Sequence, residues 1–523
     1  MNKVILLIGL LIFTASCEDY LRETPLTDIS ADFVYNSPEG LETGVVGLYN
    51  FNRQIYETSR HEWFMPIMLA SRTDVALNRA GVLSLFGKYI WGVKPDGYQA
   101  YLMSWYWQLY YKIADRANGI IKAANELENI DEARRAQILS EAKFFRARAF
   151  FTLYRMFNNI YVTEEPTTPE NAFNVINDKT PSAEIFALIN SDLDYAIEHL
   201  DWTTDEFGRI TQGTARHLKA KVALWQENWQ EAKTQSETII NDGPYNLVPN
   251  TKDVFNGDLN NSETIFAVQF AEGIPGGSKA NMINWNFIPR YFKVDGAKLT
   301  MVYGGQGAAF LLPNNYLLNL LAEDPDDDRD DNSYFRLYYF YNDPDNLPDS
   351  VSLGDTIDIY KPTTDLEESP TNAQYYERIH PACLKYVQED GDAETVMQIS
   401  NIMVYRLAET YLIAAEANMR LGNQADALEY LNTVRRRAHA SDLTTIDQQT
   451  ILDERARELA FEGQRWFTLK RMGVMEHQIV TYAGDDHYMN DARGLFQPHY
   501  VNFPIPQSQL DLLGPNYPQN DGY

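Results

Sequence analysis

The fold is decided by residues 408–438, AETYLIAAEANMRLGNQADALEYLNTVRRRA. Apolar residues recur there at three- and four-residue spacing on both sides of Gly422-Asn423, which predicts two helices joined by a short turn. Ala415 and Ala427 stand twelve residues apart, one in each helix. Small side chains at matched positions let two antiparallel helices approach closely. The segment is therefore expected to form a tight helical hairpin.

A second segment, residues 213–244, repeats this design. Ala220 and Ala232 again stand twelve residues apart, with Trp229 before the second alanine and Pro244 after its helix. These offsets match the tetratricopeptide pattern, whose units stack side by side, although two generic helical hairpins remain the alternative. Residues 99–127 and 133–157 are long amphipathic patterns that predict further helices.

Residues 245–400 differ from both flanks. They are rich in Gly, Pro and Asn and contain short β-like runs such as Thr264–Val268. The fold class predicted is mainly α, a tetratricopeptide-like α/α superhelical scaffold with a loop-rich inserted region that contains short β-strands. The expected divisions are an N-terminal helical region at 37–244, the insertion at 245–400 and a C-terminal helical region at 401–523.

The N-terminus carries a targeting pattern. Lys3 precedes the apolar run Val4–Phe13, and small residues come directly before Cys17. This predicts a signal peptide at 1–16, lipidation of the Cys17 thiol and a polar tether over 17–36. The apolar run is too short to span a bilayer, so acyl chains would hold the protein to a membrane.

Charge and motifs exclude several classes of function. The 523 residues carry 73 acidic and 44 basic side chains, a net charge of −29, which has the wrong sign for a nucleic-acid binder. No HExxH, Walker A or GxSxG motif occurs, and no metal site is assigned. Residues 324–331, DPDDDRDD, lack the spacing of an EF-hand, which leaves a non-EF calcium site open against a solvated acidic loop.

Charged residues of the segment 453–466 stand three apart, as in the pairs Arg455/Glu458 and Glu462/Arg465. This spacing predicts ion pairs along one helix face rather than catalysis. Aromatic residues in irregular stretches are the better candidates for ligand contacts. Trp91, Tyr98 and Trp285 lie beside polar residues, where a flat ring can stack on a sugar while its neighbours bind hydroxyl groups.

Several blocks of the chain resemble the SusD/RagB family of outer-membrane nutrient-binding lipoproteins. They include DYLRETP at 19–25, YRLAETYLIAAEA at 405–417 and ERARELAFEGQRWFTLKR at 454–471. The resemblance implies a non-catalytic protein that needs no cofactor, is anchored at the outer membrane and faces the cell exterior. It would capture oligosaccharides and deliver them to a SusC-like TonB-dependent barrel. Asp74 lies where members often carry a polar segment, and joins Trp91, Tyr98 and Trp285 as a candidate ligand residue.

Three alternatives remain open at the level of sequence. A peptide-binding member of the same family would differ only in its site loops. A surface glycoside hydrolase would need a pair of carboxylates that sequence does not reveal. A repeat scaffold that binds only another protein would bind neither soluble glycan nor peptide.

Overall fold

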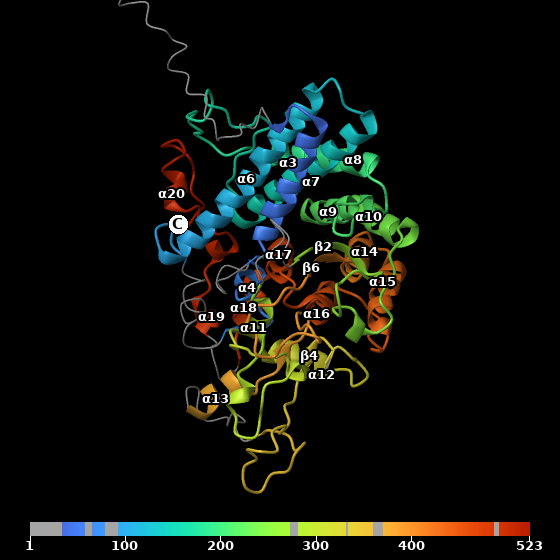
Figure 1. Ribbon diagram of the computed structural model, residues 1–523, viewed down its shortest axis with the longest axis vertical. Coiled ribbons are helices and arrows are strands. Elements are labelled where there is room, and N and C mark those ends of the chain that lie inside the picture. The colour runs from blue at the N-terminus through green and yellow to red at the C-terminus, as the bar shows by residue number, and fades with distance from the viewer. Residues whose placement is uncertain are drawn as a thin grey trace, which may run out of the picture.

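Long helices form the upper and right-hand parts of the molecule, and short helices, strands and loops form the lower part (Figure 1). The computed structural model describes residues 34–57, 65–78, 93–271, 281–330, 333–358, 370–485 and 491–523. The longer helices are α3 (Pro38–Gln54), α6 (Tyr98–Glu126), α7 (Glu132–Phe157), α8 (Ser182–His199), α9 (Gln212–Trp225), α10 (Trp229–Asp242), α14 (Leu407–Arg420), α15 (Gln424–Arg437) and α16 (Gln448–Leu459).

Shorter elements complete the chain. The short helices are α4 (Met65–Ala70), α11 (Ile283–Phe287), α12 (Asn315–Ala322), α13 (Pro370–Arg378), α17 (Arg465–Arg471), α18 (Met475–Tyr482), α19 (Asp491–Leu495) and α20 (Gln507–Leu510). Single 3₁₀ turns lie at Thr251–Asp253, Tyr291–Lys293, Met301–Tyr303 and Pro498–Val501. The strands are β1 (Ala76–Asn78), β2 (Thr264–Val268), β3 (Leu311–Pro313), β4 (Phe335–Arg336), β5 (Ala382–Cys383) and β6 (Ile402–Arg406).

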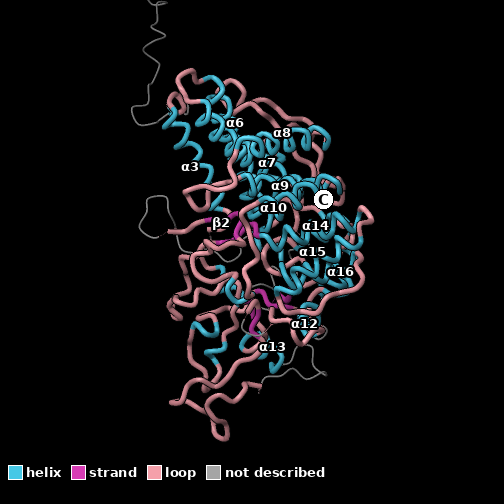
Figure 2. The backbone as a smooth tube through the Cα atoms, turned by 90° about the vertical axis from the view of Figure 1, so that its right-hand side faces the viewer, coloured by secondary structure: helices cyan, strands magenta, loops and turns pink. Residues whose placement is uncertain are grey.

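The helices stack in sequence order through the two predicted hairpins. Helix α6 packs on α7, α7 on α8, α8 on α9 and α9 on α10, and α10 then packs on α14, which pairs with α15. Figure 2 shows this column of helices along one side and the loops below it. The fold class is therefore confirmed: a helical scaffold carries a loop-rich insertion with short strands.

The small residues explain why the hairpins α9/α10 and α14/α15 stack directly. Ala220, Ala232 and Ala417 have no exposed surface and form one apolar cluster between α9, α10 and α14. Ala415 and Ala427 are equally buried in the contact between α14 and α15. Larger side chains at these positions would force the helix axes apart.

Strand pairing fixes the base of the insertion. Strand β2 pairs antiparallel with β6, with Thr264 opposite Arg406 and Val268 opposite Ile402. Farther along, β4 pairs with β5, which sets Arg336 opposite Ala382. The β-like run at 264–268 is thus a strand as predicted, whereas its partner β6 lies in a segment expected to be helical.

The ion pairs predicted along residues 453–466 are structural, but their partners were wrong. Arg455 donates to Glu409 of α14 at 3.3 Å rather than to Glu458. The partners of Glu458, Glu462 and Arg465 also lie on other elements. These side chains are buried at contacts between elements, where partners from other elements replace a neighbour one turn away. Within the described part of the chain, no helix has both the length and the hydropathy to cross a membrane.

Candidate functional site

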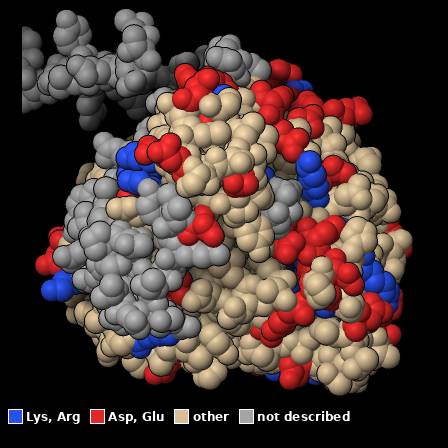
Figure 3. Space-filling model, turned by 90° about the horizontal axis from the view of Figure 1, so that it is seen from below, with Lys and Arg blue, Asp and Glu red and all other residues tan. Residues whose placement is uncertain are grey.

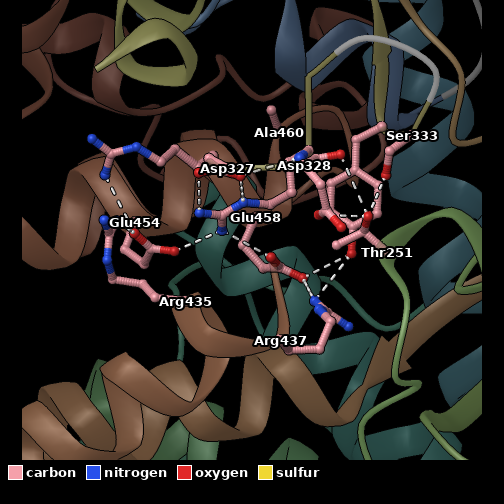
Figure 4. A network of polar contacts seen from close by, with 12 residues as sticks. Thr251, Asp327, Asp328, Ser333, Arg435, Arg437, Glu454, Glu458 and Ala460 are labelled. Carbon is pink, nitrogen blue, oxygen red and sulfur yellow. Dashed lines mark hydrogen bonds and ion pairs between the residues drawn. The ribbon is translucent and has the colours of Figure 1, made fainter. Parts of the chain in front are cut away.

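A buried network of charges joins the insertion to the C-terminal helices (Figure 4). Arg329, in the loop after α12, donates to Glu454 at 2.6 Å and to Glu458 at 3.0 Å, both on α16. It also donates to Asp327 of its own loop at 2.6 Å. Glu458 accepts a further bond from Arg406, at the end of β6, at 2.6 Å. All five side chains are almost fully buried, so the network fixes the insertion against α16.

The network keeps Glu458 ionised. Burial by itself raises the pKa of a carboxyl group, but the guanidinium groups of Arg437, Arg406 and Arg329 hold the pKa of Glu458 well below its usual range. Removing that negative charge would take one buried carboxylate partner from each of these three arginines.

Hydrogen bonds attach three segments that border a cavity to this network. Thr251 donates to the Asp328 carboxylate at 2.8 Å, and Ser333 donates to the Thr251 hydroxyl at 2.6 Å. Figure 4 shows these three residues side by side. Lys385 donates to the backbone oxygen of Glu458 at 2.6 Å. The loops that follow or flank Thr251, Ser333 and Lys385 are therefore held on a rigid base.

The cavity has a volume of about 590 Å³, within the usual range for a small-molecule site. Its lining comes from residues 252–256, 300–302, 333–336 and 384–389. Phe255, Met301 and Val302 supply apolar surface, and Asn256 and Arg336 are among the polar groups. A second cavity of about 450 Å³ lies against α6 and residues 166–168. We take the first as the candidate site because its walls are loops on a rigid scaffold, where binding residues usually lie.

The predicted site residues do not gather at this cavity. Asp74 is fully buried, and Arg465 donates to its two carboxylate oxygens at 2.8 and 2.5 Å, which is a structural ion pair. Trp285 is half-buried on α11, edge-to-face with Phe310 at 5.0 Å between ring centroids, and does not line the cavity.

The remaining predicted residues cannot be placed against the cavity. Tyr98 begins α6, but its side chain lies outside the described residues, as do Trp91 and Cys17. Ligand contacts at Asp74, Trp91, Tyr98 and Trp285, and lipidation of Cys17, therefore stay predictions.

Sequence reasoning missed the residues that do line the cavity. Phe255, Val302 and Arg336 come from three segments whose spacing shows no periodicity that brings them together. The signal in the sequence was compositional: the apolar residues Met301 and Val302 stand just before Tyr303-Gly304-Gly305 in the loop-rich region. The structure adds that Val302 is 67% exposed. An exposed apolar residue beside a glycine turn is a reason to inspect a loop for binding.

The acidic loop at 324–331 is tied to the network through several carboxylates. Asp327 pairs with Arg329, and Asp324 accepts from the backbone of Ser441 at 2.7 Å. Among the described residues, no three His, Cys, Asp or Glu side chains are grouped so as to hold a metal ion. Calcium binding at this loop stays a prediction.

Comparison with known protein families covers nearly the whole chain. The family described as "SusD family" matches residues 262–523, and the one described as "Starch-binding associating with outer membrane" matches residues 19–224. The SusD-like protein P25 of Formosa agariphila is 26% identical over 98% of this chain and 97% of its own length. The starch-binding protein SusD of Bacteroides thetaiotaomicron is 34% identical over 24% of this chain and 22% of its own length.

Solved structures share the fold. A laminarin-binding SusD-like protein superposes with a TM-score of 0.71 and 22% identity, covering 93% of this chain and 100% of that one. A SusD homologue from Bacteroides thetaiotaomicron gives a TM-score of 0.74 and 19% identity, covering 93% and 97%. With a family match over half of its length and relatives that align with almost all of it, the chain belongs to the SusD family.

Proposed function

We propose that this protein binds oligosaccharides in the cavity formed by residues 252–256, 300–302, 333–336 and 384–389. The observation that carries the proposal is the construction of that cavity: apolar faces and hydrogen-bonding groups meet on loops anchored to a buried ionic network. Apolar surface suits the C–H face of a sugar, and polar groups suit its hydroxyls. Relatives named for starch and laminarin binding support a carbohydrate as the ligand.

The same proposal covers where the protein acts. A lipid on Cys17 anchors the chain at the outer membrane with its site toward the exterior, and a SusC-like TonB-dependent barrel receives the captured glycan. The apolar run before Cys17 supports the anchor, and the match of residues 19–224 to a family described as associating with the outer membrane supports the location. The protein is a carrier without catalytic activity, so weak and rapidly exchanging binding suits transfer to a partner.

The test is calorimetric titration of residues 18–523 against a panel of soluble glycans. Val302→Trp fills the cavity from an exposed position, and the matched control Val175→Trp changes a similarly exposed valine outside the cavity. We expect a glycan that binds the wild type and the Val175 variant but not the Val302 variant. Equal binding by all three proteins would show that the glycan binds outside this cavity. The Trp285→Ala variant would then test the region around α11.

Two further arms separate the alternatives. Binding of peptides without any glycan response would favour the peptide-binding branch of the family. Release of shorter sugars during prolonged incubation of a glycan with the pure protein would show a hydrolase and refute the carrier function.

A further inference from the structure

One side chain of the cavity is not explained by binding of neutral sugars. Arg336 ends β4, lines the cavity and is only 4% exposed. Its guanidinium carbon lies 4.9 Å from the ring centroid of Tyr303. No hydrogen bond or ion pair joins this guanidinium to any other residue that the structure describes, and its Nε is buried without a partner.

This isolation is unusual among the arginines of the same region. Arg329 contacts three carboxylates, Arg406 also pairs with three, and Arg290 donates to Glu377 at 2.6 Å. Carboxylates are abundant in a chain of net charge −29, and acidic side chains form patches toward the top and right of the view from below (Figure 3). Among the described residues, the lack of a counter-charge at Arg336 is therefore a local property of the cavity.

The surroundings of Arg336 are aromatic and neutral. Tyr303, Tyr291 and Tyr339 pack together beside it, and burial raises the pKa of Tyr291 to about 12, so its phenol stays uncharged at neutral pH. The Tyr339 hydroxyl is also buried without a partner among the described residues. The Tyr303 ring makes a cation–π contact with the guanidinium, and none of the three rings supplies a counter-charge.

The mouth of the cavity does not neutralise Arg336 either. Lys252 and Glu389 both line it and face each other at 3.7 Å, each more than half exposed. Because these two charges balance, the described lining residues keep one net positive charge, which lies on the buried side of the cavity. A guanidinium in such a setting binds a planar or tetrahedral oxyanion through two parallel N–H groups.

We infer that the cavity selects acidic glycans, with Arg336 binding a carboxylate or sulfate group of the sugar. This inference rests on the proposed glycan binding and adds the class of sugar. An unpaired buried cation destabilises the apo fold, and a ligand anion relieves that penalty only when it is bound.

The experiment titrates residues 18–523 with three probes: a galacturonic acid trisaccharide, a galactose trisaccharide, and the galactose trisaccharide carrying sulfate esters. We expect at least one anionic probe to bind about 10- to 100-fold more tightly than the neutral one, as a charge-assisted bond provides. The preference between carboxylate and sulfate identifies the anion. Added salt should weaken binding of the anionic probe and leave binding of the neutral probe unchanged.

In the variant Arg336→Met, the affinity for the anionic probe should fall to the affinity for the neutral probe. Because it removes an unpaired buried charge, its melting temperature should equal or exceed that of the wild type, which separates lost binding from misfolding. Arg420→Met, at an exposed arginine of α14, is the matched control and should bind like the wild type.

The outcomes separate this inference from the proposed function. Equal affinity for neutral and anionic probes, or an Arg336→Met variant that keeps the preference, overturns the inference while glycan binding stands. Absence of binding by all three probes and by the wider glycan panel overturns both. Binding of an acidic peptide in place of the sugars would assign Arg336 to peptide carboxylates and refute the acidic-glycan inference.

Discussion

Replacing Glu458 by Gln tests whether the buried network holds the insertion on the scaffold. The carboxylate accepts bonds from Arg329, Arg406, Arg437 and the Tyr334 hydroxyl. Breaking a buried ion pair typically costs about 3–5 kcal/mol. Each arginine keeps another carboxylate after the change, because Arg329 retains Asp327 and Glu454 and the other two retain Glu263. We therefore expect Glu458→Gln to lower the free energy of unfolding by about 3 kcal/mol, at the lower end of that range.

The assay is unfolding in guanidinium chloride followed by tryptophan fluorescence. Glu429→Gln is the matched control, because Glu429 pairs with Arg436 at 2.8 Å on the exposed surface and such pairs contribute about 0–1 kcal/mol. If Glu458→Gln lowered the free energy of unfolding as little as Glu429→Gln does, the network would not hold the insertion on the scaffold. Because the folded pKa of Glu458 lies below its unfolded value, its contribution is present above about pH 4.3 and is lost as pH falls through the folded pKa. The gap between wild type and Glu458→Gln should therefore be constant from pH 5 to 8 and narrow in acid.

Four further expectations concern other parts of the molecule. Burial lowers the pKa of His380 to about 4. As pH falls from 7 to 4, the free energy of unfolding of the wild type should therefore drop by up to about 3 kcal/mol relative to that of His380→Gln, measured by urea unfolding at each pH. Parallel curves of unfolding free energy against pH for the two proteins would contradict this. Ala417→Leu should destabilise the contact of α14 with α10 by about 1–3 kcal/mol, whereas Ala425→Leu at an exposed position should not. Removal of calcium with EDTA should leave the melting temperature unchanged if arginines alone neutralise the loop at 324–331, and a rise in melting temperature on adding calcium would instead establish a site there. Cys17→Ala should abolish metabolic labelling with palmitate and release the chain from the outer-membrane fraction; retention of both would refute the lipid anchor.

The helical part of the fold was predictable because its determinants are local. The twelve-residue interval between Ala220 and Ala232 is a direct consequence of two helices and a short turn, and the structure places both alanines in one cluster. Strand β6 was not predictable in this way. Its five residues run directly into α14, and the strand that pairs with them begins at Thr264, more than a hundred positions earlier.

The candidate site depended even less on local pattern. Four segments from different parts of the insertion meet at the cavity, and long-range ion pairs set their positions. Charge spacing in 453–466 indicated ion pairs between neighbours, and Arg457 does pair with Glu454 one turn away, but the partners of Arg455 and Arg465 come from other elements. Asp74 was selected for its polar context, and the structure shows that this context includes a buried arginine from α17.

The antiparallel pairing of β2 with β6 brings the two ends of the insertion together, so its loops can vary without changing where it joins the helical scaffold. Both ends of the segment between them emerge at one point, next to α14. The entropy of closing a flexible loop grows only with the logarithm of its length, so doubling an exposed loop within that segment would cost only about 0.6 kcal/mol in closure entropy, provided that the buried contacts of Arg329 and Lys385 are kept. Exposed loops of the insertion can thus change in length as well as in sequence while the column of helices beside them stays intact.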